Sequence, residues 1–272
     1  MEQLADGRYG PWRWIDRTFG TKIDGGNPNS DANVLHVHER TPGQALAPQF
    51  AMVRMTNKGS AASVGFGVRF MKAMWVAGQW VNGTTTYTDD TTDFQSAATG
   101  DCVLETTTNN DGHIVACKKL FSAICYNVST ASTGSPVRTL EYSTGTSTWT
   151  AMPAFHSFIP SGANYALGEN FAWFAIPNDW AVMAAGHGTG VPVGYYGIRV
   201  RSTTAPTVAA IASSITVHYI TPLAFALATS ATATMEFGGQ YAPFPPDCDA
   251  IVGCSQPTNG GNSIQALIRT RE

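Results

Sequence analysis

Residues 140–152 (LEYSTGTSTWTAM) constrain the fold of this chain more than any other segment. Tyr142 and Trp149 lie on two short runs of residue types that are enriched in β-strands. Between the runs, Gly145 stands in a Ser/Thr-rich stretch and supplies the backbone freedom that a tight reversal needs. The segment therefore predicts a β-hairpin with an aromatic side chain on each arm.

Strand-like runs recur along the whole chain, and no segment has the periodicity of a long helix. Residues 64–70 and 195–203 alternate apolar side chains with polar side chains or glycine, as strands with one buried face do. Strand signals spaced by roughly eight to twelve residues are typical of an antiparallel sandwich. We therefore predict an all-β protein, an antiparallel β-sandwich of jelly-roll-like type.

Two turn signals predict further hairpins. The dipeptide Asn82-Gly83 lies between the aromatic residues of 75–88, and the run NNDG lies within 102–121. Gly and Asn favour such reversals because they tolerate the backbone conformations that tight turns require. We expect each of these two segments to fold back on itself as a pair of neighbouring strands.

The chain divides into three predicted parts. Residues 1–33 form an extended N-terminal arm, 34–221 the β-sandwich domain, and 222–272 a C-terminal β tail. The tail either completes the sandwich or lies against a neighbouring subunit. An arm with this many aromatic residues must pack them on its own body or on a partner. The candidate interface residues are Tyr9, Trp12, Trp14, Phe19, Phe225, Tyr241 and Phe244.

Composition narrows the class of partner. Charged residues make up only 13% of the chain and hydrophobic residues 43%, which argues against a disordered protein. Two readings remain: an ordinary sandwich, and a subunit whose surface is largely covered by its neighbours. The net charge of -3 gives no case for nucleic acid as a partner. Arg199 and Arg201 alternate along a strand, so we expect them to mark its solvent-facing side.

Neither targeting nor disulfide bonding is indicated. The N-terminus lacks a basic region followed by an apolar stretch, so we expect no signal peptide. The apolar segment 223–228 is too short to span a bilayer, and we expect no membrane partner. The five cysteines fit no zinc spacing and predict buried thiols made in a reducing cytoplasm. Two disulfides stay open as alternatives, Cys102 with Cys117 and Cys248 with Cys254.

No motif indicates catalysis. There is no G-x-S-x-G elbow and no glycine-rich phosphate loop before a helix. His36 and His38 could form half of a metal site, although two surface histidines are the simpler reading. The acidic run 89–93 (DDTTD) could offer carboxylates to calcium, but it lacks the spacing of a calcium loop. We expect no enzyme activity, no metal and no cofactor.

Two other residue groups allow alternatives. Nothing favours a glycosidase pair such as Glu105 with Asp111 or Glu141, although the sequence does not exclude one. Tryptophan rings could stack on sugar rings, but filling a core or an interface is the favoured role for most of them. The tryptophans concerned are Trp75, Trp80, Trp149, Trp173 and Trp180.

The order of four segments between residues 75 and 220 resembles a β-sandwich module of tailed-bacteriophage virion proteins and of uncharacterised microbial proteins. The pattern is a strand ending in Phe, a Tyr-turn-Trp hairpin, a Phe-x-x-Pro-x-x-Trp segment and a Tyr-Tyr-x-x-Arg-x-Arg strand. The matching positions are Phe121, Tyr142 and Trp149, Phe174, Pro177 and Trp180, and Tyr195, Tyr196, Arg199 and Arg201.

This resemblance implies a non-enzymatic structural role on a phage particle. The expected function is that of a capsid decoration or cement protein, assembled in the host cytoplasm and located in the virion. Its expected partners are the major capsid protein or other virion subunits and copies of itself, in a trimer or a dimer. The alternative is a carbohydrate- or receptor-binding module of a phage tail, fibre or baseplate, or of an adhesin, with a glycan as its partner.

Overall fold

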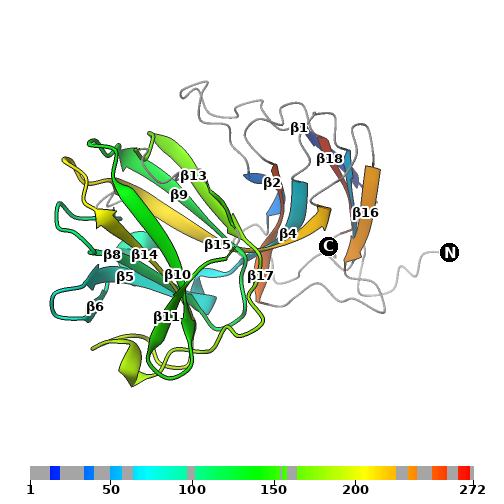
Figure 1. The fold of residues 1–272 in the computed structure, drawn as a ribbon. Helices are drawn as coiled ribbons and strands as arrows, with labels where there is room; N and C mark the ends of the chain where they lie inside the picture. The colour runs from blue at the N-terminus through cyan, green and yellow to red at the C-terminus, as the bar shows by residue number, and fades with distance from the viewer. Residues whose placement is uncertain are drawn as a thin grey trace. The chain divides into compact units, whose positions relative to one another are not determined.

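The protein is an all-β molecule with antiparallel strands, as predicted (Figure 1). Within the residues that the structure describes, the helical elements are single turns of three or four residues, too short to traverse a bilayer: η1 (Lys72–Met74), α1 (Thr91–Phe94) and η2 (Ala185–His187). The computed structural model describes residues 13–18, 34–39, 50–56, 64–96, 102–153, 155–157, 164–224, 232–237, 247–255 and 263–269.

The chain forms two compact units that are discontinuous in sequence. One unit comprises residues 1–25, 31–71 and 220–272, and the other comprises 26–30 and 72–219. The predicted arm, sandwich and tail are consecutive segments of the chain, whereas each of the two units groups residues that contact one another and are not consecutive in sequence. Residues 34–71, which we assigned to the sandwich, group with the tail.

The first unit contains two antiparallel strand groups. One has the order β1-β18-β3-β16 and the other β4-β17-β2. Strand β1, within the predicted arm, pairs with β18 of the predicted tail. Strand β3 lies between two tail strands, β18 and β16. The bounds are β1 (Arg13–Thr18), β2 (Val34–Glu39), β3 (Phe50–Thr56), β4 (Val64–Phe70), β16 (Thr232–Phe237), β17 (Cys248–Ser255) and β18 (Ser263–Arg269).

The second unit is the β-sandwich proper. One sheet has the order β11-β10-β14-β8-β5-β6, and the other has the order β12-β13-β9-β15, with β7 paired to β15. The first sheet comprises β5 (Trp75–Val81), β6 (Thr86–Asp89), β8 (Gly112–Cys117), β10 (Val137–Thr144), β11 (Thr148–Ala151) and β14 (Tyr196–Thr204). The second comprises β7 (Cys102–Val103), β9 (Ala123–Thr130), β12 (Phe155–Ser157), β13 (Gly168–Phe174) and β15 (Ile211–Ala224).

Two of the three predicted hairpins are present. Strands β10 and β11 pair around a turn in which Gly145 has a φ of +55°, a left-handed conformation that favours glycine. Strands β5 and β6 form the hairpin predicted from Asn82-Gly83. The hairpin predicted over 102–121 is wrong, because β7 pairs with β15 and β8 belongs to the opposite sheet. Residues 104–111 connect the two sheets, and their turn does not join paired strands.

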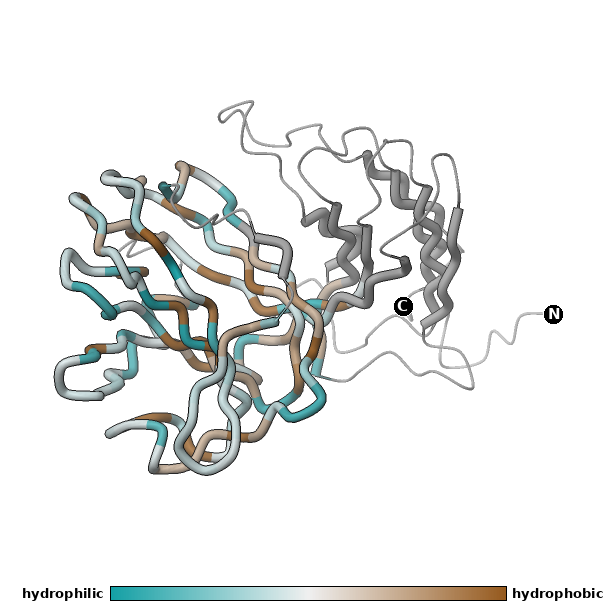
Figure 2. The backbone as a smooth tube through the Cα atoms, in the orientation of Figure 1, coloured by the Kyte–Doolittle hydropathy of each residue, from teal (hydrophilic) through white to brown (hydrophobic). Residues whose placement is uncertain are grey.

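The main core lies between the two sheets of the second unit. Trp75, Val115 and Val200 from one sheet and Tyr126 and Val217 from the other are all buried. Figure 2 shows hydrophobic residues alternating with more hydrophilic ones along these strands, the pattern that gives each strand one apolar face. Burial of this face is the main driving force for the sandwich.

A smaller apolar cluster covers the outer face of the six-stranded sheet. Residues 181–195 pass over this face and add Met183 and Val191 to the strand residues Trp80, Tyr87 and Ile114. Backbone hydrogen bonds attach the segment, since the N–H of residue 87 donates to the Thr189 carbonyl and that of residue 181 to the Ser143 carbonyl. The sheet is therefore covered on both faces.

Candidate functional site

The tryptophans proposed as sugar-stacking residues are inside the second unit. Trp75, Trp80, Trp173 and Trp180 are buried, and Trp149 is half-buried. The indole Nε1 of Trp149 donates to the backbone carbonyl of His187 at 3.2 Å, which holds the ring against the covering segment. The packing role that the sequence favoured is confirmed for these five residues.

Arg199 is enclosed, contrary to the expectation of a solvent-facing side chain. Its guanidinium lies 5.0 Å from the ring centroid of Trp80 and 4.7 Å from that of Trp149. It also forms an ion pair of 2.7 Å with Glu141, and its side chain is only 11% exposed. Burial lowers the pKa of Arg199 from its usual value, while Glu141 opposes that shift. Stacking between two indoles desolvates and stabilises the cation at once.

Glu141 is shared between two arginines. Arg201 reaches it at 2.9 Å from the next outward-facing position of β14, and the same arginine bonds Asn110. A carboxylate held by two guanidiniums has its lone pairs occupied and is unsuited to act as a general base. The possible pairing of Glu141 with Glu105 as a glycosidase couple therefore has no geometric support.

Several landmarks of the resemblance meet in one aromatic cluster. Trp180 lies at its centre. The distances from the ring centroid of Trp180 to those of its four neighbours are 5.0 Å for Phe121, 5.9 Å for Tyr196, 6.0 Å for Phe174 and 6.3 Å for Tyr142. These residues come from strands of both sheets and from the loops beside them. Edge-to-face aromatic contacts each add about 1 kcal/mol beyond area burial. The motif thus encodes packing.

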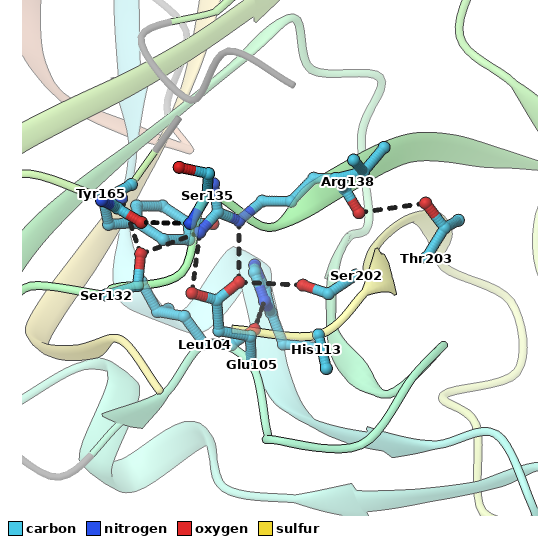
Figure 3. A network of polar contacts seen from close by, with 12 residues as sticks. Leu104, Glu105, His113, Ser132, Ser135, Arg138, Tyr165, Ser202 and Thr203 are labelled. Atoms are coloured by element: carbon cyan, nitrogen blue, oxygen red, sulfur yellow. Dashed lines mark hydrogen bonds and ion pairs between the residues drawn. The ribbon is translucent and has the colours of Figure 1, made fainter. Parts of the chain in front are cut away.

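A buried ion pair between Arg138 and Glu105 connects strands β10 and β14 with the loops that contain Glu105 and Ser132 (Figure 3). Arg138 on β10 donates from Nε and Nη2 to the two carboxylate oxygens of Glu105, both at 2.7 Å. The hydroxyl of Ser202 donates to the same carboxylate at 2.8 Å, and Arg138 also reaches Ser132 at 2.9 Å. The guanidinium stacks 4.2 Å above the ring of Tyr165. Removing either charge would leave the other buried and uncompensated.

His113 joins the two sheets inside the core. Its Nδ1 lies 2.6 Å from the carbonyl of Leu104, an acceptor, so this nitrogen carries the proton. Its Nε2 therefore accepts a hydrogen bond from the hydroxyl of Tyr126 on the opposite sheet, at 3.0 Å. Burial lowers the pKa of His113 to about 4 and raises the pKa of Tyr126 well above its usual range. Both groups are neutral near pH 7 and suit a structural bond.

The candidate metal positions are not assembled into a site. Within the described ranges, no three His, Cys, Asp or Glu side chains are close enough to hold a metal ion. In the acidic run 89–93, Asp89 accepts hydrogen bonds from the N–H and hydroxyl of Thr91, and Asp90 precedes helix α1. His36 and His38 lie on β2, and their side chains are outside the described part.

The described cysteines are buried thiols, as predicted. Cys102, Cys117, Cys125 and Cys248 are not in disulfides, so the alternative bond between Cys102 and Cys117 is absent. Burial raises the pKa of Cys125 well above its usual value, which makes its thiol unreactive. The side chain of Cys254 is not described.

Of the seven candidate interface residues, only Trp14 lies within the described residues. Trp14 lies on β1, where its backbone pairs with Leu267 of β18. This part of the arm is therefore bound to the tail of the same chain. The remaining candidates lie outside the described residues: Tyr9, Trp12, Phe19, Phe225, Tyr241 and Phe244.

The described loops at one end of the second unit carry no charged residue. We call this surface the uncharged end; it comprises residues 106–110, 129–137, 164–168 and 203–210. Hydrogen bonds tie these segments together, from the N–H of residue 135 to the Asn164 side chain and from that of residue 205 to the Asn109 side chain. The apolar side chains exposed there are Val137 at 38%, Val208 at 45% and Leu167 at 53%.

The uncharged end was not foreseen from the sequence, because its four segments are far apart in the chain. Glu105, Asp111, Arg138 and Glu169 directly precede or follow these loops. Glu105 and Arg138 are buried and neutralise each other, Asp111 is buried, and Glu169 is exposed at the margin of the surface. Within this margin the loops present hydroxyl, amide and apolar groups to solvent. Only the low overall charge of the chain hinted at such a patch.

Comparison with known proteins adds no identification. No protein-family model matches the chain, and no curated protein and no solved structure shows significant similarity to it. The resemblance to virion modules stays a prediction.

Proposed function

We propose that this protein is a non-enzymatic structural protein of a virus particle, a decoration or cement protein bound to the head of a tailed phage. The observation that carries the proposal is the uncharged end, with exposed Val137, Leu167 and Val208 among threonine, serine and asparagine. The cores of protein–protein interfaces are depleted of charged residues in the same way. The resemblance of residues 75–220 to virion modules supplies the class of partner.

A rigid body is what a cement protein requires, and several features supply rigidity. The second unit is covered on both faces of its six-stranded sheet, and Glu105–Arg138 and His113–Tyr126 cross-link its interior. Such a body can present a preformed surface to the major capsid protein without paying the entropy of ordering loops on contact. Copies of the chain would occupy equivalent capsid positions as trimers or dimers.

The arm contributes less to this proposal than its aromatic residues suggested. Its strand β1 is paired on one side with β18 of the same chain, so the backbone groups on that side are not available to a capsid subunit. The uncharged end replaces the arm as the primary candidate contact. The glycan-binding alternative has weaker support, because four of the five rings that would stack on sugars are buried and the fifth, Trp149, is half-buried.

Binding to undecorated phage heads tests the proposal. The purified protein is mixed with heads that lack decoration, and bound protein is measured by co-sedimentation. A Val208→Lys/Leu167→Lys double variant places two charges on the uncharged end and should lose most of the binding. Val193→Lys serves as the matched control, since Val193 is 60% exposed but lies outside that end. Size-exclusion chromatography with light scattering gives the oligomeric state.

Three results would count against the proposal. The wild-type protein could ignore heads altogether, the double variant could bind as well as wild type, or the control could lose binding equally. Retention on an array of glycans without binding to heads would favour the receptor-binding alternative instead.

A further inference from the structure

We propose that Asn82 is a site of spontaneous deamidation, in which its side-chain amide is converted to a carboxylate through a cyclic imide with Gly83. The reaction needs a backbone nitrogen able to reach the preceding side chain and a following residue without bulk. The turn between β5 and β6 presents Asn82 next to an exposed glycine with open space around it in the folded protein. No enzyme or cofactor is required.

The neighbourhood of Gly83 is open. A Cβ placed on this glycine would meet no heavy atom within 4 Å, and residues 83–85 are exposed to solvent. Within the described part of the chain, the Gly83 N–H and the Asn82 side-chain amide take part in no hydrogen bond. The attacking Gly83 nitrogen and the Asn82 side-chain carbonyl carbon are therefore not held by hydrogen bonds to other described groups. Absence of a side chain on Gly83 also lets the backbone rotate into the geometry of ring closure.

The surrounding contacts hold the turn itself in place. The N–H of Thr85 donates to the Asn82 carbonyl at 3.1 Å, and the N–H of Asn82 donates to Asp111 at 2.8 Å. Two threonine hydroxyls at 85 and 86 bond the carbonyl of Thr84. These bonds fix the ends of the turn and leave the Asn82–Gly83 peptide at its exposed corner.

The chemistry balances with water alone. The Gly83 nitrogen attacks the side-chain carbonyl carbon of Asn82, a C–N bond forms, and ammonia leaves with the amide proton. Water then opens the five-membered imide at either carbonyl. The products are aspartate or isoaspartate at this position, each with one more negative charge than the original chain. The isoaspartate form also lengthens the backbone beside the hydrogen bond to Asp111.

Peptide-resolved mass spectrometry of the intact, folded protein tests this inference. Samples are incubated at mildly alkaline pH, digested, and examined for the mass shift of amide-to-carboxyl conversion and for isoaspartate. Conversion should accumulate at Asn82, and Gly83→Ala should slow it several-fold. That variant has room for its methyl group, so it should fold normally and serve as the matched control. Peptide resolution also separates this site from Asn259-Gly260, which lies outside the described residues.

Two outcomes would overturn the inference. One is an unmodified Asn82 in the folded protein under conditions that convert it in the denatured chain, which would mean that the turn protects it. The other is equal conversion in Gly83→Ala and wild type, which would mean that ring closure through residue 83 is not the route. An ion-exchange profile should change in parallel, because each event adds a negative charge.

Discussion

His113 shows how one buried side chain sets a pH limit on the fold. In the folded protein its pKa is lowered to about 4 by burial, against an ordinary value of 6.5. The unfolded chain therefore binds a proton at pH 5 that the folded chain does not, and stability must fall as the pH drops from about 6.5 toward 4. The loss should be on the order of 3 kcal/mol at full extent. Above pH 6.5 this residue contributes no pH dependence.

Denaturant unfolding at a series of pH values measures this effect. His113→Gln keeps a polar side chain but cannot titrate, so the variant should be less stable than wild type at pH 7 and should have a shallower slope between pH 6.5 and 4. Glu105, Arg138 and Tyr126 face or adjoin the imidazole and are unchanged in the comparison. An equal slope in the two proteins would show that another group governs acid sensitivity.

At the scale of elements, strands β8 and β14 can approach closely at Gly112 because glycine has no side chain. Gly112 begins β8, opposite Arg201 of β14, and a Cβ at this position would lie 1.9 Å from the carbonyl oxygen of Val200. The neighbour is backbone and cannot move without opening the sheet. Gly112→Ala should therefore destabilise the fold by about 3 kcal/mol or more, at the upper end for overpacking.

Gly83→Ala is the matched comparison for Gly112→Ala. The open space around residue 83 predicts a change within about 0.5 kcal/mol, as for ordinary surface substitutions. Thermal and urea unfolding of the two variants measure the difference in stability between them. Similar midpoints would mean that the strand spacing at β8 and β14 is more compliant than this geometry implies.

At the scale of the whole molecule, the second unit is nearly continuous in sequence. Residues 72–219 contain all of it except 26–30, whereas the first unit is built from three separated segments. The second unit has its own core and its own polar cross-links. We expect a protein of residues 72–219 to fold alone, with a β-sheet circular dichroism spectrum and cooperative unfolding.

Tryptophan fluorescence provides a second measurement on that fragment. It retains Trp75, Trp80, Trp149, Trp173 and Trp180, which are buried or half-buried, so emission should be blue-shifted and should shift red on unfolding. Emission typical of exposed indole, or unfolding without a transition, would contradict independent folding. The separated segments of the first unit allow no equivalent single fragment.

Local patterns predicted the elements of the fold because they depend on neighbouring residues. Gly145 and the Asn82-Gly83 dipeptide predicted their hairpins through turn chemistry. The run NNDG failed as a hairpin signal because the strands on its two sides belong to different sheets: β7 pairs with β15, whereas β8 pairs with β5 and β14. Alternation placed Arg199 on the outer face correctly but could not show that residues 181–195 cover that face.

The sequence by itself determined that this chain is an antiparallel β protein, since the period of its apolar residues and its turn residues are local properties of the chain. Only the tertiary structure decided which distant groups meet. Glu105 and Arg138 are separated by 33 residues, and the four segments of the uncharged end are distributed between residues 106 and 210. Contacts of this kind follow from sheet order and register, which arise from the packing of the whole core and leave no local mark in the sequence.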